Sequence, residues 1–249
     1  MDDVPKTFPG RLPSTAAAAA SLADEAYERV KRDILSGELL PGTKLRVDHI
    51  SQRYAIGSSP VREALTRLAA EKFVLREQAR GFSVATVSLE ELNELTDTRC
   101  LVEEMALRRS IAGGGIEWEE GIVLAYHRLK RVPRPTAGSP LVPGSEWLVM
   151  HDAFHTALIA ACGSRWLLDF CCRMREQSYL YRRESSLERG SGPDEHAAIM
   201  EATIARDADV AVDRLLSHYR LSAELTARRL REQALARSGR RAPRRRAAV

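Results

Sequence analysis

The chain has 249 residues, of which 44% are hydrophobic and 29% charged, so it is long enough for about two ordinary globular domains. Its formal net charge of +4 is unevenly distributed, because six arginines follow residue 236 while residues 88–236 carry a net charge of −4. No apolar run approaches the length of a membrane span, and the alanine tract at 16–20 lacks the basic start of a signal peptide. We therefore expect a cytoplasmic protein without a membrane partner.

The first predicted element is a helix that begins near residue 26. This helix is indicated by an apolar stripe at helical spacing, formed by Tyr27, Val30, Ile34 and Leu35. Gly37 and the following Pro41-Gly42 pair end this helix, because glycine readily takes the left-handed conformation found at helix C-termini. Residues 1–20 are predicted to be disordered, so the first domain starts near residue 21.

Two short helices separated by a tight turn follow. Ile50 and Tyr54 lie four residues apart and form the apolar side of the first. Gly57 is predicted to break that helix, and Ser58 or Ser59 to cap the next one.

The second of these helices has two unlike faces. Val61, Leu65 and Leu68 repeat at i, i+4 and i+7 and face the core. The opposite face holds short hydroxyls and a cation: Ser58, Ser59, Arg62 and Thr66. Hydroxyls at a helix N-terminus can donate to phosphates, and an arginine one turn further in can reach a phosphate or guanine. This pattern is typical of a recognition helix in duplex DNA.

Two β-rich runs, 73–77 and 82–87, come next and enclose the turn Gln78-Ala79-Arg80-Gly81. They predict a hairpin with a basic tip. In a winged helix-turn-helix such a tip lies in or beside the minor groove, where Arg80 can use the negative potential and Gly81 permits close backbone approach. Residues 21–87 are thus predicted to form a winged helix-turn-helix DNA-binding domain.

From Ser88 onward the pattern is helical. Ser88 and Glu91 form a capping box, and an apolar stripe follows at Leu92, Leu95, Leu101, Val102, Met105 and Ala106. Further helices are predicted near 116–131, 145–162, 164–186, 193–206 and 208–236. The cysteines lack metal-knuckle spacing and are expected to be reduced. The predicted fold class is mainly α, with the winged domain followed by an all-α bundle over 88–236 and a basic disordered tail over 237–249.

Four of the six histidines lie in the predicted bundle helices. His151 and His155 are four residues apart on one helix face, and His196 and His218 come from later helices. Such imidazoles suit a divalent metal such as Zn²⁺ or Ni²⁺. A histidine pair at this spacing is also compatible with a solvated face or a satisfied core, and spacing alone does not separate the two.

The first domain closely resembles the GntR family of bacterial transcription regulators. The resemblance rests on the order Ile34-Leu35-Ser36-Gly37, then Pro60-Val61-Arg62-Glu63-Ala64-Leu65, then Arg80-Gly81-Phe82, and it spans about residues 26–87. Family members often carry Ser-Arg-Thr before Pro-Val-Arg, whereas this chain has Gly57-Ser58-Ser59. The DNA-binding residues it implies are Ser58, Ser59, Arg62, Thr66, Arg67, Arg80 and Gly81, although Arg67 has Glu63 and Glu71 as alternative partners.

Segments 98–106, 151–158 and 194–199, together with the isolated His218, resemble the FCD effector domain of the FadR branch of that family, over roughly residues 88–231. Many such domains bind a divalent metal through one aspartate and three histidines. Here His155, His196 and His218 match the histidines, while His151 occupies the aspartate position and Asp152 lies beside it. The resemblance also implies a small carboxylate effector, held by Arg99 and by Arg182 on a helix that carries Tyr179 and Tyr181.

These features predict a homodimeric, ligand-responsive transcription regulator, a repressor more often than an activator in this family. Two winged domains would contact a roughly palindromic operator, and the bundle would dimerise and bind the effector. Two alternatives remain: a metal-dependent hydrolase that uses the histidine cluster with Asp152, and a regulator for which the metal itself is the signal. The arginine-rich tail either adds nonspecific DNA affinity or keeps the chain soluble.

Overall fold

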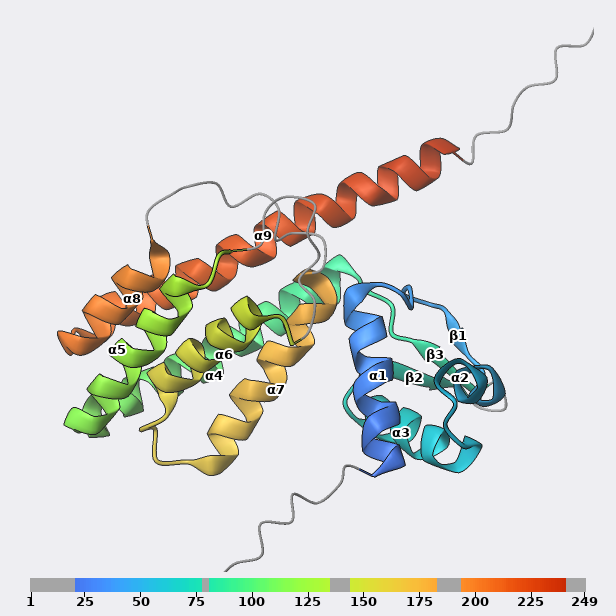
Figure 1. The fold of residues 1–249 in the computed structure, drawn as a ribbon. Helices are drawn as coiled ribbons and strands as arrows, with labels where there is room; N and C mark the ends of the chain where they lie inside the picture. Colours follow the sequence, from blue (N-terminus) through green and yellow to red (C-terminus); the bar gives the residue numbers. More distant parts are fainter. Residues whose placement is uncertain (1–20, 78–80, 135–143, 183–193, 241–249) are drawn as a thin grey trace, which may run out of the picture.

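The computed structural model describes residues 21–77, 81–134, 144–182 and 194–240 (Figure 1). A winged domain comes first, and a bundle of helices follows it. The last helix, α9, runs along the bundle and continues beyond it (Figure 1). No helix in the described ranges is both long enough and apolar enough to cross a membrane.

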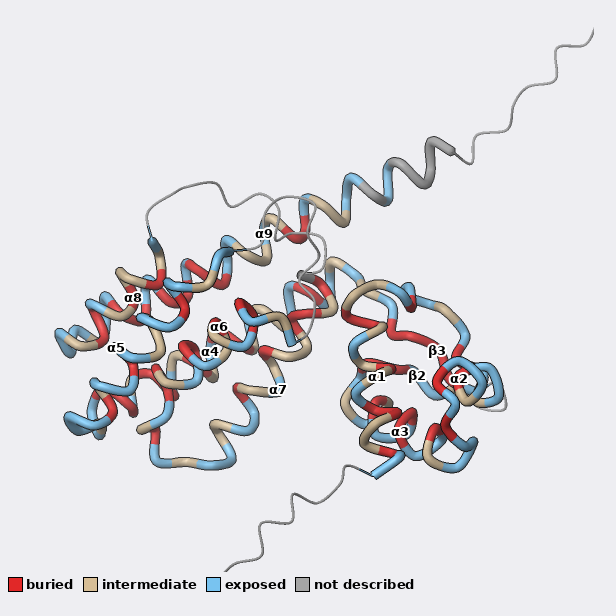
Figure 2. The backbone as a smooth tube through the Cα atoms, in the orientation of Figure 1, coloured by how far each residue is buried: buried red, intermediate tan, exposed pale blue. Residues whose placement is uncertain are grey.

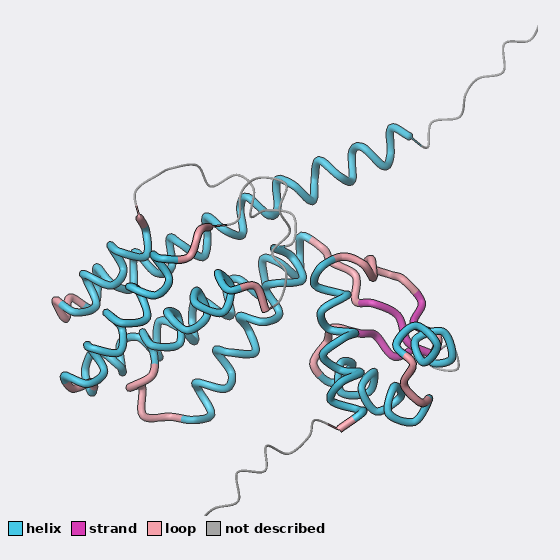
Figure 3. Tube along the Cα trace, in the orientation of Figure 1, coloured by secondary structure: helices cyan, strands magenta, loops and turns pink. Residues whose placement is uncertain are grey.

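The winged domain packs three helices against a small antiparallel sheet, which holds all the strands of the described residues (Figure 3). Its elements are α1 (Leu22–Ser36), β1 (Lys44–Leu45), α2 (Val47–Tyr54), α3 (Ser58–Ala70), β2 (Val74–Glu77) and β3 (Gly81–Val84). The strand order is β1-β3-β2, and Glu77 pairs with Gly81 where β2 and β3 meet the turn. The predicted hairpin is therefore present. The two-residue strand β1 was not predicted, because two residues are too short for a period-2 pattern.

Local caps set the helix ends in this domain. Ser21 and Asp24 form a reciprocal capping box at the start of α1, and Gly37 closes that helix at φ 87°. The turn between α2 and α3 differs from its prediction. Ala55, at φ 55°, ends α2, and Gly57 is the N-cap residue of α3, so neither Ser58 nor Ser59 caps that helix.

The second domain is all helical in its described residues, as predicted. It contains α4 (Leu89–Gly113), α5 (Ile116–Arg131), α6 (Glu146–Ile159), α7 (Arg165–Arg182), α8 (Glu195–Ile204) and α9 (Ala208–Arg240). Ser88 caps α4 by accepting a hydrogen bond from the Glu91 amide at 3.0 Å. α9 continues to Arg240, past residue 237 where the tail was predicted to begin. The four cysteines are free thiols, and only Cys172 is not fully buried.

The predicted apolar stripe of α4 is partly wrong. Leu101 is 69% exposed and Met105 is 54% exposed, whereas Leu92 and Ala106 are buried. The buried face is turned toward Arg99 and Glu103 instead, and it continues through Leu107, Ser110 and Ile111. Because α4 buries a charged pair, part of its core face consists of polar residues. A search for apolar periodicity does not find such positions.

The turn between α4 and α5 depends on a glycine without room for a side chain. A Cβ atom on Gly114 would lie 2.2 Å from Cε3 of Trp118 and 2.7 Å from the Ser110 carbonyl oxygen. Arg206 closes the same turn from the α8–α9 connection by donating to the Ile111 and Gly114 carbonyls, each at 2.6 Å. One end of the bundle is thus tied together by these contacts.

Gly114→Ala is expected to lower the free energy of unfolding by about 1–3 kcal/mol, because the added methyl group must displace the Trp118 ring or the backbone. Urea denaturation of the purified protein measures this. Gly121→Ala is the control: Gly121 lies inside α5 with nothing within 4 Å of the new methyl group. It should raise stability by up to about 1 kcal/mol through helix propensity. Equal destabilisation by both variants would contradict the packing role of Gly114.

Candidate DNA-binding face and buried histidine cluster

Helix α3 presents a hydrophilic face outside the core of the winged domain. Ser58, Ser59, Arg62 and Thr66 are all exposed, while Val61, Leu65 and Leu68 on the other side are fully buried. The alternation of buried and exposed positions along α3 can be followed in Figure 2. The first turn of α3 leaves its amides directed toward this exposed end, since the Gly57 N-cap supplies no side-chain acceptor. Such an end attracts anions.

Arg67, the last residue of the predicted contact set on α3, has a partner other than the expected Glu63 or Glu71. Its Nη1 lies 2.6 Å from Oδ1 of Asp24, and its guanidinium stacks on the Tyr27 ring at 4.4 Å. The hydrogen bond from Arg67 holds the pKa of the Asp24 carboxyl below its usual value. Arg67 therefore connects α3 to α1, while Arg62 lies exposed on the same helix.

The β2–β3 hairpin of the wing packs beside α3. Gly81, at φ 91°, is exposed and starts β3, and a Cβ atom there would meet nothing within 4 Å. Its left-handed backbone is what requires glycine at this position. Arg80, the predicted basic residue of the tip, lies outside the described residues.

The structure brings the four predicted metal-binding histidines together in the bundle. His151 and His155 come from α6, His196 from α8 and His218 from α9. One ring nitrogen from each lies within 4.8 Å of the others, and all four side chains are buried. Nε2 of His151 and Nε2 of His155 are 3.1 Å apart. Burial, together with the other three rings, lowers the pKa of His155 well below its usual value, so this imidazole is neutral.

Outer contacts orient two of these rings. His218 Nδ1 lies 2.7 Å from a Glu195 carboxylate oxygen, which makes this nitrogen the protonated one. The Tyr219 hydroxyl donates to Glu103, and burial raises its pKa well above the usual value, so the hydroxyl keeps its proton. Its oxygen, 3.1 Å from His155 Nδ1, therefore accepts from that nitrogen. In both rings Nε2 is the nitrogen that remains for a metal ion, which binds the neutral form of an imidazole.

This donor set fits a divalent cation. Four imidazoles converge in a buried space, and the two oriented rings have a carboxylate or a hydroxyl behind them. The carboxylate of Asp152, which the sequence placed beside the cluster, accepts from the Tyr179 hydroxyl, and one of its oxygens lies 3.9 Å from His151 Nδ1. Among the described residues, the group of possible ligand atoms that converges here comes from the four histidines.

Arg99 is the second predicted feature that the fold buries. Only 3% exposed, it binds Glu103 through Nε at 2.6 Å and stacks on the Tyr219 ring at 3.7 Å. Its Nη1 lies 3.5 Å from the Ser178 hydroxyl, while its Nη2 is buried without a partner among the described residues. An unsatisfied guanidinium nitrogen in the interior is costly, so this atom indicates an anion or a water that completes it.

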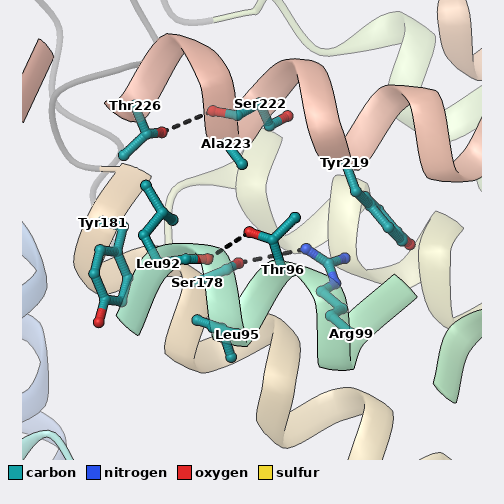
Figure 4. A pocket seen from close by; sticks show the side chains of 10 residues that line it. All are labelled: Leu92, Leu95, Thr96, Arg99, Ser178, Tyr181, Tyr219, Ser222, Ala223 and Thr226. Atoms are coloured by element: carbon teal, nitrogen blue, oxygen red, sulfur yellow. Dashed lines mark hydrogen bonds between the residues drawn. The ribbon is translucent and has the colours of Figure 1, made fainter. Parts of the chain in front are cut away.

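A small cavity between α4, α7 and α9 lies beside Arg99 (Figure 4). It is partly open to solvent, and its wall combines one cation, six hydroxyls and three apolar side chains. The lining residues are Leu92, Leu95, Thr96, Arg99, Ser178, Tyr181, Tyr219, Ser222, Ala223 and Thr226. None of the four histidines lines this cavity. Tyr219 connects the cavity to the histidines, because its ring stacks on Arg99 and its hydroxyl contacts His155.

The remaining predicted effector residues have different outcomes. Tyr181 lines the cavity and Tyr179 binds Asp152 instead, while the side chain of Arg182, at the end of α7, lies outside the described part of the structure. The sequence interpretation missed Glu103, Glu195 and Tyr219. Each has a simple signal in retrospect, since Glu103 is four residues after Arg99 and the other two adjoin His196 and His218.

Comparisons with known families give two matches along the chain. Residues 22–84 match the family described as bacterial regulatory proteins, gntR family, and residues 94–221 match the FCD domain. The two matches divide the chain between the winged domain and the bundle.

Two relatives align over most of their own length. The chain is 33% identical to the uncharacterised HTH-type transcriptional regulator BphR of Paraburkholderia xenovorans, over 87% of this chain and 90% of that protein. It is 34% identical to the HTH-type transcriptional repressor GlaR of Escherichia coli, over 78% of this chain and 90% of that protein. Both are named as regulators that act through a helix-turn-helix, which speaks against the hydrolase alternative.

Solved structures share the fold. Escherichia coli McbR/YncC superposes with a TM-score of 0.62 at 18% identity, over 84% of this chain and 99% of that chain. A structure described as a putative transcriptional regulator GntR from Rhodococcus sp. RHA1 superposes with a TM-score of 0.61. Its identity is 20%, over 82% of this chain and 96% of that chain. At these identities the likeness concerns the arrangement of the helices and strands alone.

Glu103→Gln is expected to destabilise the protein by about 3–5 kcal/mol, because it removes the charge that compensates the buried Arg99 guanidinium. The neighbouring Glu104→Gln is the matched control. Glu104 pairs with Arg108 at 2.9 Å near the surface, and its loss should cost less than about 1 kcal/mol. Urea denaturation measures both variants. A Glu103→Gln variant as stable as Glu104→Gln would contradict the dependence of Arg99 on Glu103.

Proposed function

This chain belongs to the GntR family of bacterial regulatory proteins and carries an FCD domain, and we propose that it is a homodimeric repressor whose DNA affinity responds to a small carboxylate. A dimer would place two winged domains on the half-sites of a roughly palindromic operator. A protein that acts on chromosomal DNA works in the bacterial cytoplasm. Repression, rather than activation, is supported by the name of its relative GlaR, a transcriptional repressor.

The observation that carries the proposal is the exposed end of α3. The hydroxyl-bearing first turn of α3 and Arg62 lie outside a fully packed core. The neighbouring hairpin has the exposed Gly81 as the first residue of β3. Amides and hydroxyls at this end suit phosphate oxygens, and Arg62 has the length to reach a base edge. Since Ser58 stands where the family often has an arginine, Arg62 carries more of the sequence readout.

Arg62→Ala is expected to weaken binding to operator duplexes by about 1–3 kcal/mol per half-site if Arg62 contacts a base. The salt dependence of the affinity should fall as well if the contact is to phosphate. Duplexes enriched from a random-sequence pool by the wild-type protein provide the probe, and fluorescence anisotropy at several salt concentrations provides the affinity.

The control is Arg128→Ala, since Arg128 is exposed on α5 in the bundle. It removes the same charge far from α3 and should leave the affinity unchanged. Equal affinities of the Arg62→Ala variant and the wild-type protein would refute the assigned role of α3.

The effector site is proposed at the cavity beside Arg99. Its guanidinium is charged and buried, and its Nη2 faces no acceptor among the described residues, which suits a carboxylate. The hydroxyls of the cavity wall suit a ligand that also carries hydroxyl groups. Glu103 already neutralises part of the Arg99 charge, so the site favours a ligand with a single carboxylate over a polyanion.

A divalent cation is proposed at His151, His155, His196 and His218. The convergence of four imidazoles and the outer contacts of His155 and His218 support it. What such an ion would supply, when bound, is a rigid cross-link between α6, α8 and α9. A regulator that responds to the metal alone is the second candidate, favoured by the absence of these histidines from the wall of the Arg99 cavity.

Zn²⁺ is expected to raise the free energy of unfolding by about 2.7 kcal/mol at a free concentration one hundred times its dissociation constant. His155→Ala and His218→Ala should lose this effect. His127→Ala is the matched control, because His127 is exposed on α5 outside the cluster. Thermal unfolding of metal-free protein with added Zn²⁺ measures the shift.

The same measurement, repeated with a panel of hydroxycarboxylates, separates the two candidate signals. A further rise of the unfolding temperature on addition of one of the acids supports a carboxylate effector. Duplex affinity that follows Zn²⁺ with no response to any acid supports the metal sensor. A Zn²⁺ shift that persists in the His155→Ala and His218→Ala variants would refute the proposed metal site.

A further inference from the structure

Helix α7 touches both the cavity and the winged domain. It is the bundle helix that faces α1 (Figure 1), and consecutive residues near its end point to different sides because each step around a helix is about 100°. Ser178 lines the cavity and accepts from Arg99, while its neighbours Glu176 and Gln177 contact the winged domain. A shift of this segment therefore moves both sets of contacts together.

The contact on the winged side ends on the recognition helix. The Gln177 side-chain amide donates to the carbonyl oxygen of Glu71, the residue that caps the C-terminus of α3. Lys31 of α1 bridges the two domains, because its ammonium lies 2.9 Å from a Glu176 carboxylate oxygen and 3.0 Å from the Tyr27 hydroxyl. Tyr27 in turn donates to the Glu71 carboxylate at 2.5 Å. Gln177 directly, and Glu176 through Lys31 and Tyr27, are thus connected to the C-terminal end of α3.

The bridge is shielded from solvent on the winged side. The Lys31 side chain is only 14% exposed, and its ammonium lies 5.3 Å and 4.9 Å from the ring centres of Tyr27 and Phe73. Tyr27 also carries the stacked Arg67 guanidinium, on the last turn of α3. If α7 moves away, Lys31 loses its 2.9 Å ion pair with Glu176 and keeps the Glu71 carboxylate at 4.0 Å, so the charge balance at the end of α3 depends on the position of α7.

The other side of α7 is fixed inside the bundle. Arg175, 2% exposed, donates to the Asp152 carbonyl at 2.7 Å and to the Thr156 hydroxyl at 3.0 Å, which ties α7 to the histidine-bearing helix α6. Ser178 and Tyr181 form the α7 part of the cavity wall (Figure 4). Within seven residues, α7 therefore meets the cavity, the helix that carries two histidines and the end of α3.

We propose that α7 transmits occupancy of the Arg99 cavity to the recognition helix, through the contacts of Glu176 and Gln177 with Lys31 and the Glu71 carbonyl. A ligand between α4, α7 and α9 moves α7 relative to α4. Because Glu176 and Gln177 move with it, the last turn of α3 loses or gains its bundle-side hydrogen bonds. The proposal rests on the effector site proposed above and names the route by which that site acts.

The contact itself is tested by hydrogen exchange in the full-length protein without DNA. The amides of Glu71, Lys72 and Phe73 close the last turn of α3 by donating to the carbonyls of Arg67, Ala69 and Leu68. Gln177→Ala is expected to speed their exchange by about 2- to 10-fold, the effect of one lost hydrogen bond. Arg173→Ala, an exposed change on the same helix, is the control and should leave these amides unchanged.

Transmission is tested by filling the cavity without a ligand. Ala223→Leu places a larger side chain in the wall between α4, α7 and α9, and it should accelerate exchange of the same three amides because the displaced α7 lengthens its contacts. Glu176→Gln combined with Gln177→Ala should abolish this response to Ala223→Leu. Ala153→Leu, an exposed change on α6, is the matched control and should have no effect.

Three results would overturn the proposal: no response of the α3 amides to Ala223→Leu, an equal response to Ala153→Leu, or an unchanged response in the Glu176→Gln, Gln177→Ala background. If Ala223→Leu does not fold, the smaller Ala223→Val is judged by the same criteria. The readout contains no DNA. Lost transmission with normal duplex binding therefore refutes only the role of α7, and normal transmission without duplex binding refutes only the proposed function.

Discussion

The buried positive charge of Arg99 is the constraint on which the bundle depends. A guanidinium that is 3% exposed requires a negative partner, and Glu103, itself fully buried, supplies it from the next turn of α4. Glu103 also accepts from Tyr219 on α9, and Tyr219 lies against His155. One compensated charge thus fixes the rotation of α4, the approach of α9 and the tautomer of a histidine in the cluster.

This network gives the two proposed ligands different surroundings. The histidines form a buried cluster of ring nitrogens, which matches a cation that stays bound. Arg99 faces a cavity that is partly open to solvent, has one cation and is rich in hydroxyls, which matches a ligand that exchanges. Tyr219 belongs to both, because its ring stacks on Arg99 and its hydroxyl touches His155. An ion in the cluster would therefore hold one wall of the cavity in place.

Much of the fold was predictable because its signals are local. The α3 face, the hairpin, the Ser88 cap and the helices of the second domain follow from capping residues and from periods of two or 3.6. The errors have a common physical cause. Leu101 and Met105 are exposed because α4 turns a charged pair toward the core, and Arg67 pairs with Asp24 because α1 packs beside α3. Long-range contacts decided both.

By itself the sequence determined that a cationic, hydroxyl-bearing helix precedes a hairpin, and that four histidines and one arginine lie on helices of a second domain. Helix and turn signals act over a few residues, so they are readable from the chain alone. Only the tertiary structure decided that the four imidazoles converge, that Asp152 accepts from Tyr179, and that Glu103, Glu195 and Tyr219 complete the site. Those outcomes depend on how buried charge and hydrogen-bonding groups from distant segments satisfy one another when the helices pack, and no local pattern specifies that.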